Sequence, residues 1–156
     1  MIRIELPRGL RRCGPRESDS GTVYHIRTST FHGQPTFGDM TSVDALISCL
    51  RSLEVGGEVE TLAFVILPDH LHWLVRLSGD TCVDAVTRSL KRDSTLAVNR
   101  RLGCTRMTVW EPGYIERLLT EPEEIRMVKR YIAANAAHGA VGLPRSGYPI
   151  WEPGCP

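Results

Sequence analysis

The stretch Leu67-Pro68-Asp69-His70-Leu71-His72-Trp73-Leu74 decides how this chain is predicted to fold. Its second half has the composition of a β-strand, and side chains along a strand alternate between the two faces of a sheet. His70 and His72 are therefore expected on one face, and Leu71 and Trp73 on the other. Two imidazoles side by side can hold a metal ion, but a pair of ordinary solvent-facing histidines has the same pattern.

An amphipathic helix further along the chain supplies two more polar groups. Its apolar residues recur at helical spacing: Ile125, Val128, Ile132 and Ala136. Thr120 is the expected N-cap, with Glu123 completing a capping box, and Gly139 is the expected end. Tyr131 and Asn135 are four residues apart, so their side chains are predicted to lie on the same face of the helix.

Periodicity and turn residues predict the remaining elements. Strands are expected over residues 22–31, 61–67, 70–77 and 107–118, and two further helices begin at Thr41 and Thr81 and end before Gly56 and Gly103. Pro68-Asp69 joins the two middle strands, either as a short hairpin turn or as a bulge in one bent strand.

The resulting order, β-α-β-β-α-β-α, predicts an α+β fold: a ferredoxin-like antiparallel sheet with its helices packed on one face. Residues 21–143 form the expected domain. Residues 1–20 are expected to be a basic, irregular arm, and residues 144–156 an extended tail.

Three blocks of sequence resemble a known family. Residues 68–74 contain the His-hydrophobic-His motif, residues 109–117 precede the last helix, and residues 131–135 contain the tyrosine and the asparagine. In the order and spacing of these blocks the chain resembles the REP-associated tyrosine transposases, a branch of the bacterial single-tyrosine HUH transposases. One departure is Ala136, where the family usually has proline.

The resemblance implies an enzyme that cleaves and transfers single-stranded DNA beside a hairpin-forming repeat. Tyr131 would be the catalytic nucleophile and would form a 5′-phosphotyrosine bond. His70, His72 and Asn135 would bind a divalent metal ion that offsets the charge of the scissile phosphate. The family implies Mg²⁺ or Mn²⁺, whereas the ligand types alone favour manganese or zinc, which leaves Zn²⁺ as the lesser choice.

Other residues near these blocks have competing interpretations. Tyr131 can also be an interface tyrosine, and Asn135 a residue near the helix end. Tyr114 is the rival nucleophile, but a strand aromatic explains it better because no amide follows it at helical spacing. His25 and His32 belong near the first strand, where a structural or a DNA-contacting role is as plausible as a role in the site.

The distribution of charge favours nucleic acid more than the net charge does. The net charge is only +1, yet 17 of the 19 basic residues are arginine, whose planar fork suits phosphate. Coding bias and solvated helix faces would give the same composition. The residues expected to contact the DNA backbone are Arg8, Arg11, Arg12, Arg88, Lys91, Arg92 and Arg101. Phe31, Phe37 and Trp110 are candidates for stacking on unpaired bases, or for the core.

The remaining features bound the function. Five widely spaced cysteines argue against a disulfide framework and favour a reducing cytoplasm, and the family resemblance implies a bacterial, nucleoid-associated protein. Neither a membrane span nor a signal peptide is expected. The oligomeric state, monomer or homodimer, stays open. Two other functions remain possible at this point: a domesticated, non-catalytic protein that binds DNA hairpins, and a zinc-dependent hydrolase of small molecules.

Overall fold

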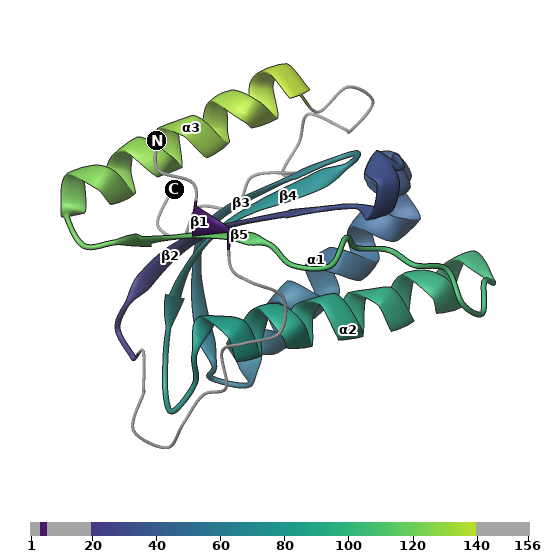
Figure 1. Ribbon diagram of the computed structural model, residues 1–156, viewed down its shortest axis with the longest axis horizontal. Coiled ribbons are helices and arrows are strands. Elements are labelled where there is room, and N and C mark those ends of the chain that lie inside the picture. The colour runs from purple at the N-terminus through teal and green to yellow at the C-terminus, as the bar shows by residue number, and fades with distance from the viewer. Residues whose placement is uncertain (1–3, 6–19, 140–156) are drawn as a thin grey trace.

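The fold is built on one antiparallel sheet (Figure 1). The computed structural model describes residues 4–5 and 20–139, and within them the sheet has five strands in the order β1-β5-β2-β4-β3. The strands are β1 (Ile4–Glu5), β2 (Val23–Ser29), β3 (Val59–Leu67), β4 (His70–Leu77) and β5 (Ile115–Leu119). The helices are α1 (Met40–Val55), α2 (Val83–Leu102) and α3 (Pro122–Gly139), with single 3₁₀ turns η1 (Phe31–Gly33) and η2 (Thr36–Gly38). From β2 onward the predicted order β-α-β-β-α-β-α is confirmed.

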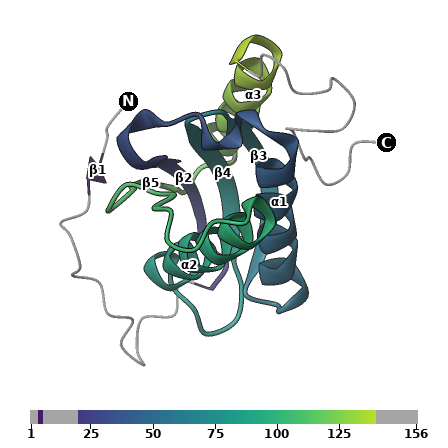
Figure 2. The same ribbon diagram turned by 90° about the vertical axis from the view of Figure 1, so that its right-hand side faces the viewer.

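The helices cover both faces of the sheet rather than one. α1 and α2 pack together on one face, and α3 lies across the other (Figures 1 and 2). The physical reason is visible in β3, where every residue except Glu60 is buried. A strand that is apolar on both faces needs a covering layer on both sides. The expectation that all helices share one face was therefore wrong for α3.

Two hydrophobic clusters fill the two layers. The larger one joins α1 and α2 to the sheet and includes Leu71 and Trp73 of β4. The smaller one joins α3 to the opposite face through Leu74 of β4 and through Val128 and Ile132 of the helix. Alternation along β4 thus divides the strand between the two clusters, as the sequence predicted.

The hairpin before β4 places the histidines at the beginning of that strand. Leu67 of β3 pairs with His70 of β4, so Pro68-Asp69 is a two-residue turn and the alternative of one bent strand is excluded. β4 lies between β2 and β3 in the sheet. His70 and His72 are therefore on a central strand, on the face that α3 covers.

Helix ends differ from prediction in their capping groups. The Asp39 side chain, not Thr41, caps α1, because its carboxylate accepts a hydrogen bond from the Thr41 amide at 2.9 Å. At α3 the Glu124 carboxylate accepts from the Thr120 amide at 3.2 Å, so the expected capping box with Glu123 is replaced by a carboxylate one residue later. Both carboxylates lie at helix N-termini, where the helix dipole favours negative charge.

α2 begins and ends close to the predicted residues. It starts after Cys82 rather than at Thr81, and it stops at Gly103, whose φ of 68° is the left-handed conformation that glycine adopts without strain. Cys49 and Cys104 are free, whereas Cys82 is disulfide-bonded. The expectation of no disulfide framework has an exception at this position.

The strand expected over 107–118 is shorter and shifted to Ile115–Leu119. A turn at Pro112-Gly113 interrupts it, and Trp110 instead forms an isolated bridge to Thr30. The Trp110 indole donates a hydrogen bond to Ser94 Oγ of α2 at 2.9 Å, which ties this irregular segment to the larger core.

Parts of the sequence predictions fall outside the described residues. Most of the basic arm, including Arg8, Arg11 and Arg12, and the tail over 144–156 are among them. No helix in the described ranges combines the length and the apolar character needed to cross a membrane.

Candidate active site

Two histidine rings lie together at the start of β4, on the face toward α3. The ring centroids of His70 and His72 are 5.0 Å apart and the rings are nearly perpendicular. His72 is only 3% exposed, and its burial, with the nearby charges of His25, His70 and Arg27, lowers its pKa from 6.5 to about 3. The His72 ring is therefore neutral near neutral pH, the form that a metal ligand requires.

Each of these rings has its Nδ1 atom hydrogen-bonded to a neighbour. His70 Nδ1 lies 2.7 Å from Asp69 Oδ1, and His72 Nδ1 lies 3.0 Å from Nε2 of His25. Within the described residues, neither Nε2 atom has a hydrogen-bond partner. Metal-binding histidines in proteins typically have one nitrogen held in this way and the other directed at the metal. Both rings therefore keep one nitrogen available to act as a ligand.

Tyr131 of α3 lies directly over the histidines. Its ring centroid is 5.3 Å from that of His72 and 6.2 Å from that of His25, with the Tyr131 and His72 rings nearly perpendicular. The next residue, Ile132, is completely buried in the smaller core and fixes the helix on the sheet. Tyr131 itself is 42% exposed, so part of the phenol is open to solvent while its ring lies beside those of His72 and His25.

Asn135 lies one helical turn beyond Tyr131, and its side chain folds back on its own helix. Its Nδ2 donates a hydrogen bond to the Tyr131 carbonyl at 2.9 Å. Among the interactions of the described residues, none joins Asn135 to His70 or His72, and no three His, Cys, Asp or Glu side chains there are arranged to hold a metal ion. The structure thus gathers two expected ligands and the tyrosine, and the role of Asn135 as third ligand stays a prediction.

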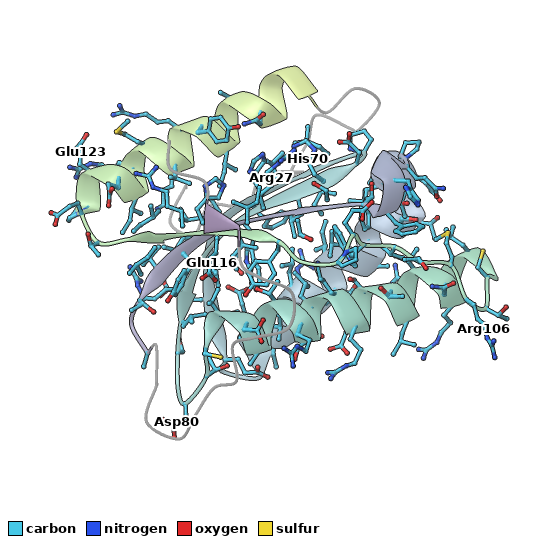
Figure 3. The ribbon with its side chains drawn as sticks, viewed as in Figure 1. Arg27, His70, Asp80, Arg106, Glu116 and Glu123 are labelled. Carbon is cyan, nitrogen blue, oxygen red and sulfur yellow. The ribbon has the colours of Figure 1, made fainter. Side chains whose placement is uncertain are left out.

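Two residues of β2 complete the site: His25, for which the sequence left several roles open, and Arg27, which it did not single out. His25 is 9% exposed, and burial, then the charges of Arg117 and Arg27, lower its pKa to about 4. Arg27 is the cross-strand partner of His72 and lies on the α3 side of the sheet near His70 (Figure 3). Arg117 is paired with Glu124 at 3.1 Å, whereas Arg27 has no ion-pair partner among the described residues. Strand alternation over 23–29 is the signal that would have found both residues, once the pairing of β2 with β4 was known.

The predicted DNA-contacting residues of α2 lie on the opposite layer of the molecule. Arg88 and Arg92 are exposed, and each forms a surface ion pair, with Asp84 at 2.6 Å and with Asp93 at 3.1 Å. Arg101 is exposed near the end of the helix. Because α2 and α3 cover different faces, these arginines are separated from Tyr131 by the sheet (Figure 2).

Lys91 differs from its arginine neighbours on α2. Its ammonium donates hydrogen bonds to the Glu111 carbonyl, at 2.8 Å, and to the Gly113 carbonyl. Burial lowers its pKa from 10.5 to about 8. The side chain holds the irregular segment before β5 against α2, so its contacts are structural.

The remaining aromatic candidates fall into the core or its border. Phe37 and Trp110 are buried and pack on each other with ring centroids 5.1 Å apart, which leaves the half-buried Phe31 as the stacking candidate. The Tyr114 hydroxyl lies 3.4 Å from an Asp84 oxygen, and burial raises the Tyr114 pKa above its ordinary value. This rival nucleophile packs against the larger core, away from the histidine pair.

The fold and this site together define a class of protein: an α+β domain with paired histidines on a central strand, facing a tyrosine on the helix that covers them. The family model described as "Transposase IS200 like" matches residues 20–135, and the chain belongs to this family. The resemblance drawn from the three sequence blocks is thereby confirmed at the level of the transposase family.

Solved structures give the same fold. The chain is similar to a REP-associated tyrosine transposase bound to a REP hairpin, with 19% identity over 78% of this chain and 70% of the other, and a TM-score of 0.62. It is also similar to a protein assigned as a transposase from Deinococcus radiodurans R1, with 22% identity, coverage of 72% and 88%, and a TM-score of 0.54. No curated protein matches the chain.

Proposed function

We propose that this transposase is a metal-dependent nuclease and strand transferase of single-stranded DNA, acting on hairpin-forming repeats through a covalent bond to Tyr131. The observation that carries the proposal is the position of Tyr131, partly exposed and 5.3 Å, ring to ring, from the buried His72. The likeness to a REP-associated transposase bound to its hairpin supports the substrate class.

The reaction conserves the energy of the phosphodiester. The Tyr131 oxygen attacks the phosphorus and forms a new O–P bond, while the bond from phosphorus to the 3′ oxygen breaks. The phosphate thus stays on the 5′ oxygen of the downstream nucleotide and becomes linked to Tyr131. The phenol gives up its proton, and the departing 3′ oxygen takes one up as a hydroxyl. Because the phosphotyrosine stores the bond, a 3′ hydroxyl of another strand end can reverse the step and complete transfer without an outside energy source.

The chain's own groups prepare the site for a phosphate. His70 and His72 each keep Nε2 available, because their Nδ1 atoms are engaged by neighbours. A Mg²⁺ or Mn²⁺ ion bound by these nitrogens would offset phosphate charge, and Asn135 would add an amide oxygen. Arg27 adds a guanidinium with no acidic partner in the described structure. Positive groups that are fixed before the substrate arrives stabilise the charge that develops in the transition state.

DNA outside the site would meet the exposed arginines of α2. Arg88, Arg92 and Arg101 lie on the other layer, so a hairpin that contacts them has to pass around an edge of the sheet while its single-stranded flank enters the site under α3. Such contacts bind the backbone without reading sequence, and they weaken with salt.

The test is covalent capture of DNA by the protein. Full-length protein is incubated with a hairpin oligonucleotide carrying a labelled single-stranded flank and MnCl₂ or MgCl₂, then resolved on a denaturing gel. We expect a labelled adduct that is absent with chelator, absent in Tyr131→Phe and retained in the matched control Tyr114→Phe.

The other outcomes separate the remaining functions. Salt-sensitive hairpin binding without an adduct indicates a domesticated DNA-binding protein. Loss of the adduct in Tyr114→Phe but not in Tyr131→Phe transfers the nucleophile to the rival tyrosine. If the protein shows no hairpin binding and forms no adduct, the proposal is contradicted, and a small-molecule hydrolase is the function left to test.

A further inference from the structure

The buried contact between His25 and His72 is not used by the reaction described above. His25 Nε2 lies 3.0 Å from His72 Nδ1, the two ring centroids are 5.2 Å apart with the ring planes inclined by 30°, and both side chains are buried. The two residues are 47 positions apart in sequence and meet through the pairing of β2 with β4. Both rings are therefore held by strand register, not by a flexible loop.

We propose that His25 is a positioning residue that selects the tautomer of His72, by accepting the hydrogen on His72 Nδ1 so that the Nε2 lone pair faces the metal. This inference rests on the proposed function, because it takes His72 as a ligand. A neutral imidazole carries one hydrogen, on either nitrogen. If His72 Nδ1 carries it, Nε2 can bind a metal. If His25 instead donates to Nδ1, His72 carries its hydrogen on Nε2 and cannot bind.

The neighbouring pair shows why the acceptor here is an imidazole. The outer ligand, His70, has the Asp69 carboxylate as its Nδ1 partner, and that carboxylate is exposed. A carboxylate at the buried position of His25 would lose much of its hydration, and it would attract the adjacent Arg27. A neutral ring accepts the hydrogen bond without taking Arg27 away from the phosphate.

Two variants of His25 separate the hydrogen bond from packing. His25→Gln keeps an acceptor in its amide oxygen, whereas His25→Leu keeps bulk and has none. Mn²⁺ binding is measured by calorimetry with MnCl₂ and no DNA. We expect His25→Leu to weaken binding by roughly 10- to 100-fold, as for other partners of metal-binding histidines. His25→Gln is expected to bind within about threefold of wild type, and so is the control variant His32→Leu, which changes an exposed histidine in η1.

A second measurement on unaltered protein covers the case in which His25→Leu does not fold. Long-range ¹H–¹⁵N spectra with saturating MgCl₂ report which nitrogen of His72 carries hydrogen, and we expect Nδ1. Hydrogen on Nε2 would overturn the proposal, as would equal metal affinity in wild type and His25→Leu, or equally weakened binding in the Leu and Gln variants.

Failure of this inference is distinct from failure of the proposed function. If His72→Ala binds Mn²⁺ as wild type does, His72 is not a ligand, and both the inference and the metal assignment fall. If His72→Ala no longer binds Mn²⁺ and the wild-type protein forms the covalent adduct, but His25→Leu binds normally, only the role of His25 is wrong.

Discussion

The two faces of the sheet use the same strands for different purposes. On the α1 and α2 face, Leu71 and Trp73 enter a large continuous core in which the Trp73 indole donates a hydrogen bond to Thr61 at 3.0 Å. On the α3 face, the alternate residues His70 and His72 lie at the border of a smaller apolar cluster, beneath a partly exposed tyrosine. One strand thus contributes apolar side chains to the large core on one side and the polar residues of the candidate site on the other.

The difference between the two faces shows that polar side chains gather on the α3 face. The smaller cluster leaves part of the α3 face to polar side chains, among which His25 and His72 have pKa values that are lowered chiefly by burial. The larger cluster supplies the apolar burial that offsets this arrangement. Substitutions on adjacent residues of β4 are therefore expected to affect different properties.

The largest effect on stability is expected on the α1 and α2 face. Trp73→Ala removes the largest fully buried side chain and should lower the free energy of unfolding by about 3–5 kcal/mol. His70→Ala, three positions earlier and half-buried, should change it by no more than about 1 kcal/mol while it abolishes the covalent adduct. Urea unfolding checks the first expectation, and comparable destabilisation of both variants would contradict the division between faces.

The α3 face should make stability depend on pH. The pKa values of His25 and His72 fall from 6.5 to about 4 and about 3 on folding, so the unfolded chain binds more protons between these values. The stabilisation from keeping these rings neutral should therefore be fully present above pH 6.5 and decline as pH falls toward 4, by about 1.4 kcal/mol for each unit of pKa shift.

Midpoints of urea unfolding measured from pH 7.5 to pH 4.5 report this dependence, because this range lies on both sides of the ordinary histidine pKa of about 6.5. The double variant His25→Gln, His72→Gln removes both titrating groups and is the control. A dependence that is as steep in the double variant as in wild type would assign the effect to carboxylates elsewhere.

A smaller effect is expected from Arg27, which has no ion-pair partner among the described residues. Arg27→Gln should reduce the rate of adduct formation by about tenfold or more, because it removes a fixed positive group near the phosphate. Arg76→Gln is the matched control. Arg76 lies on the same face of the sheet as Arg27, but it is near the end of β4 away from His70, and it forms an ion pair with Glu60 at 2.6 Å. Single-turnover kinetics distinguish the two, and equal rates in both variants would remove Arg27 from the site.

The smallest effect is expected from the arginines of α2. Arg88→Gln with Arg92→Gln should reduce the salt dependence of hairpin binding by about one unit of slope for each phosphate that these side chains neutralise in the wild-type protein. The rate of adduct formation at saturating DNA should not change, because the sheet separates these residues from Tyr131. A slower rate with an unchanged slope would place them in the reaction instead.

Local sequence patterns correctly predicted the structural features that depend only on residues close together in the chain. The Pro68-Asp69 turn and the alternation from His70 to Trp73 are contained in eight consecutive residues, and the structure confirms both. The tyrosine helix was found from its apolar period, because Ile132 and its neighbours bury one stripe.

Contacts between residues that are far apart in the sequence could not be predicted from local patterns. The contact of His25 with His72 depends on the register between β2 and β4, and no local pattern specifies that register. Lys91 was grouped with the arginines because charge alone does not reveal that two backbone carbonyls bind its ammonium. The layer of α3 was missed because β3, apolar on both faces, was not used as a signal for a second covering layer.

The length of the two-residue turn between β3 and β4 determines which face of the sheet each residue of β4 occupies. With Leu67 paired to His70, the turn contains no spare residue. Deleting one residue there would force the pairing to slip by one, and a slip of one exchanges the two faces of a strand. The imidazoles would then enter the larger core and Trp73 would lie on the α3 face, so the length of this turn is fixed by the position of the histidines.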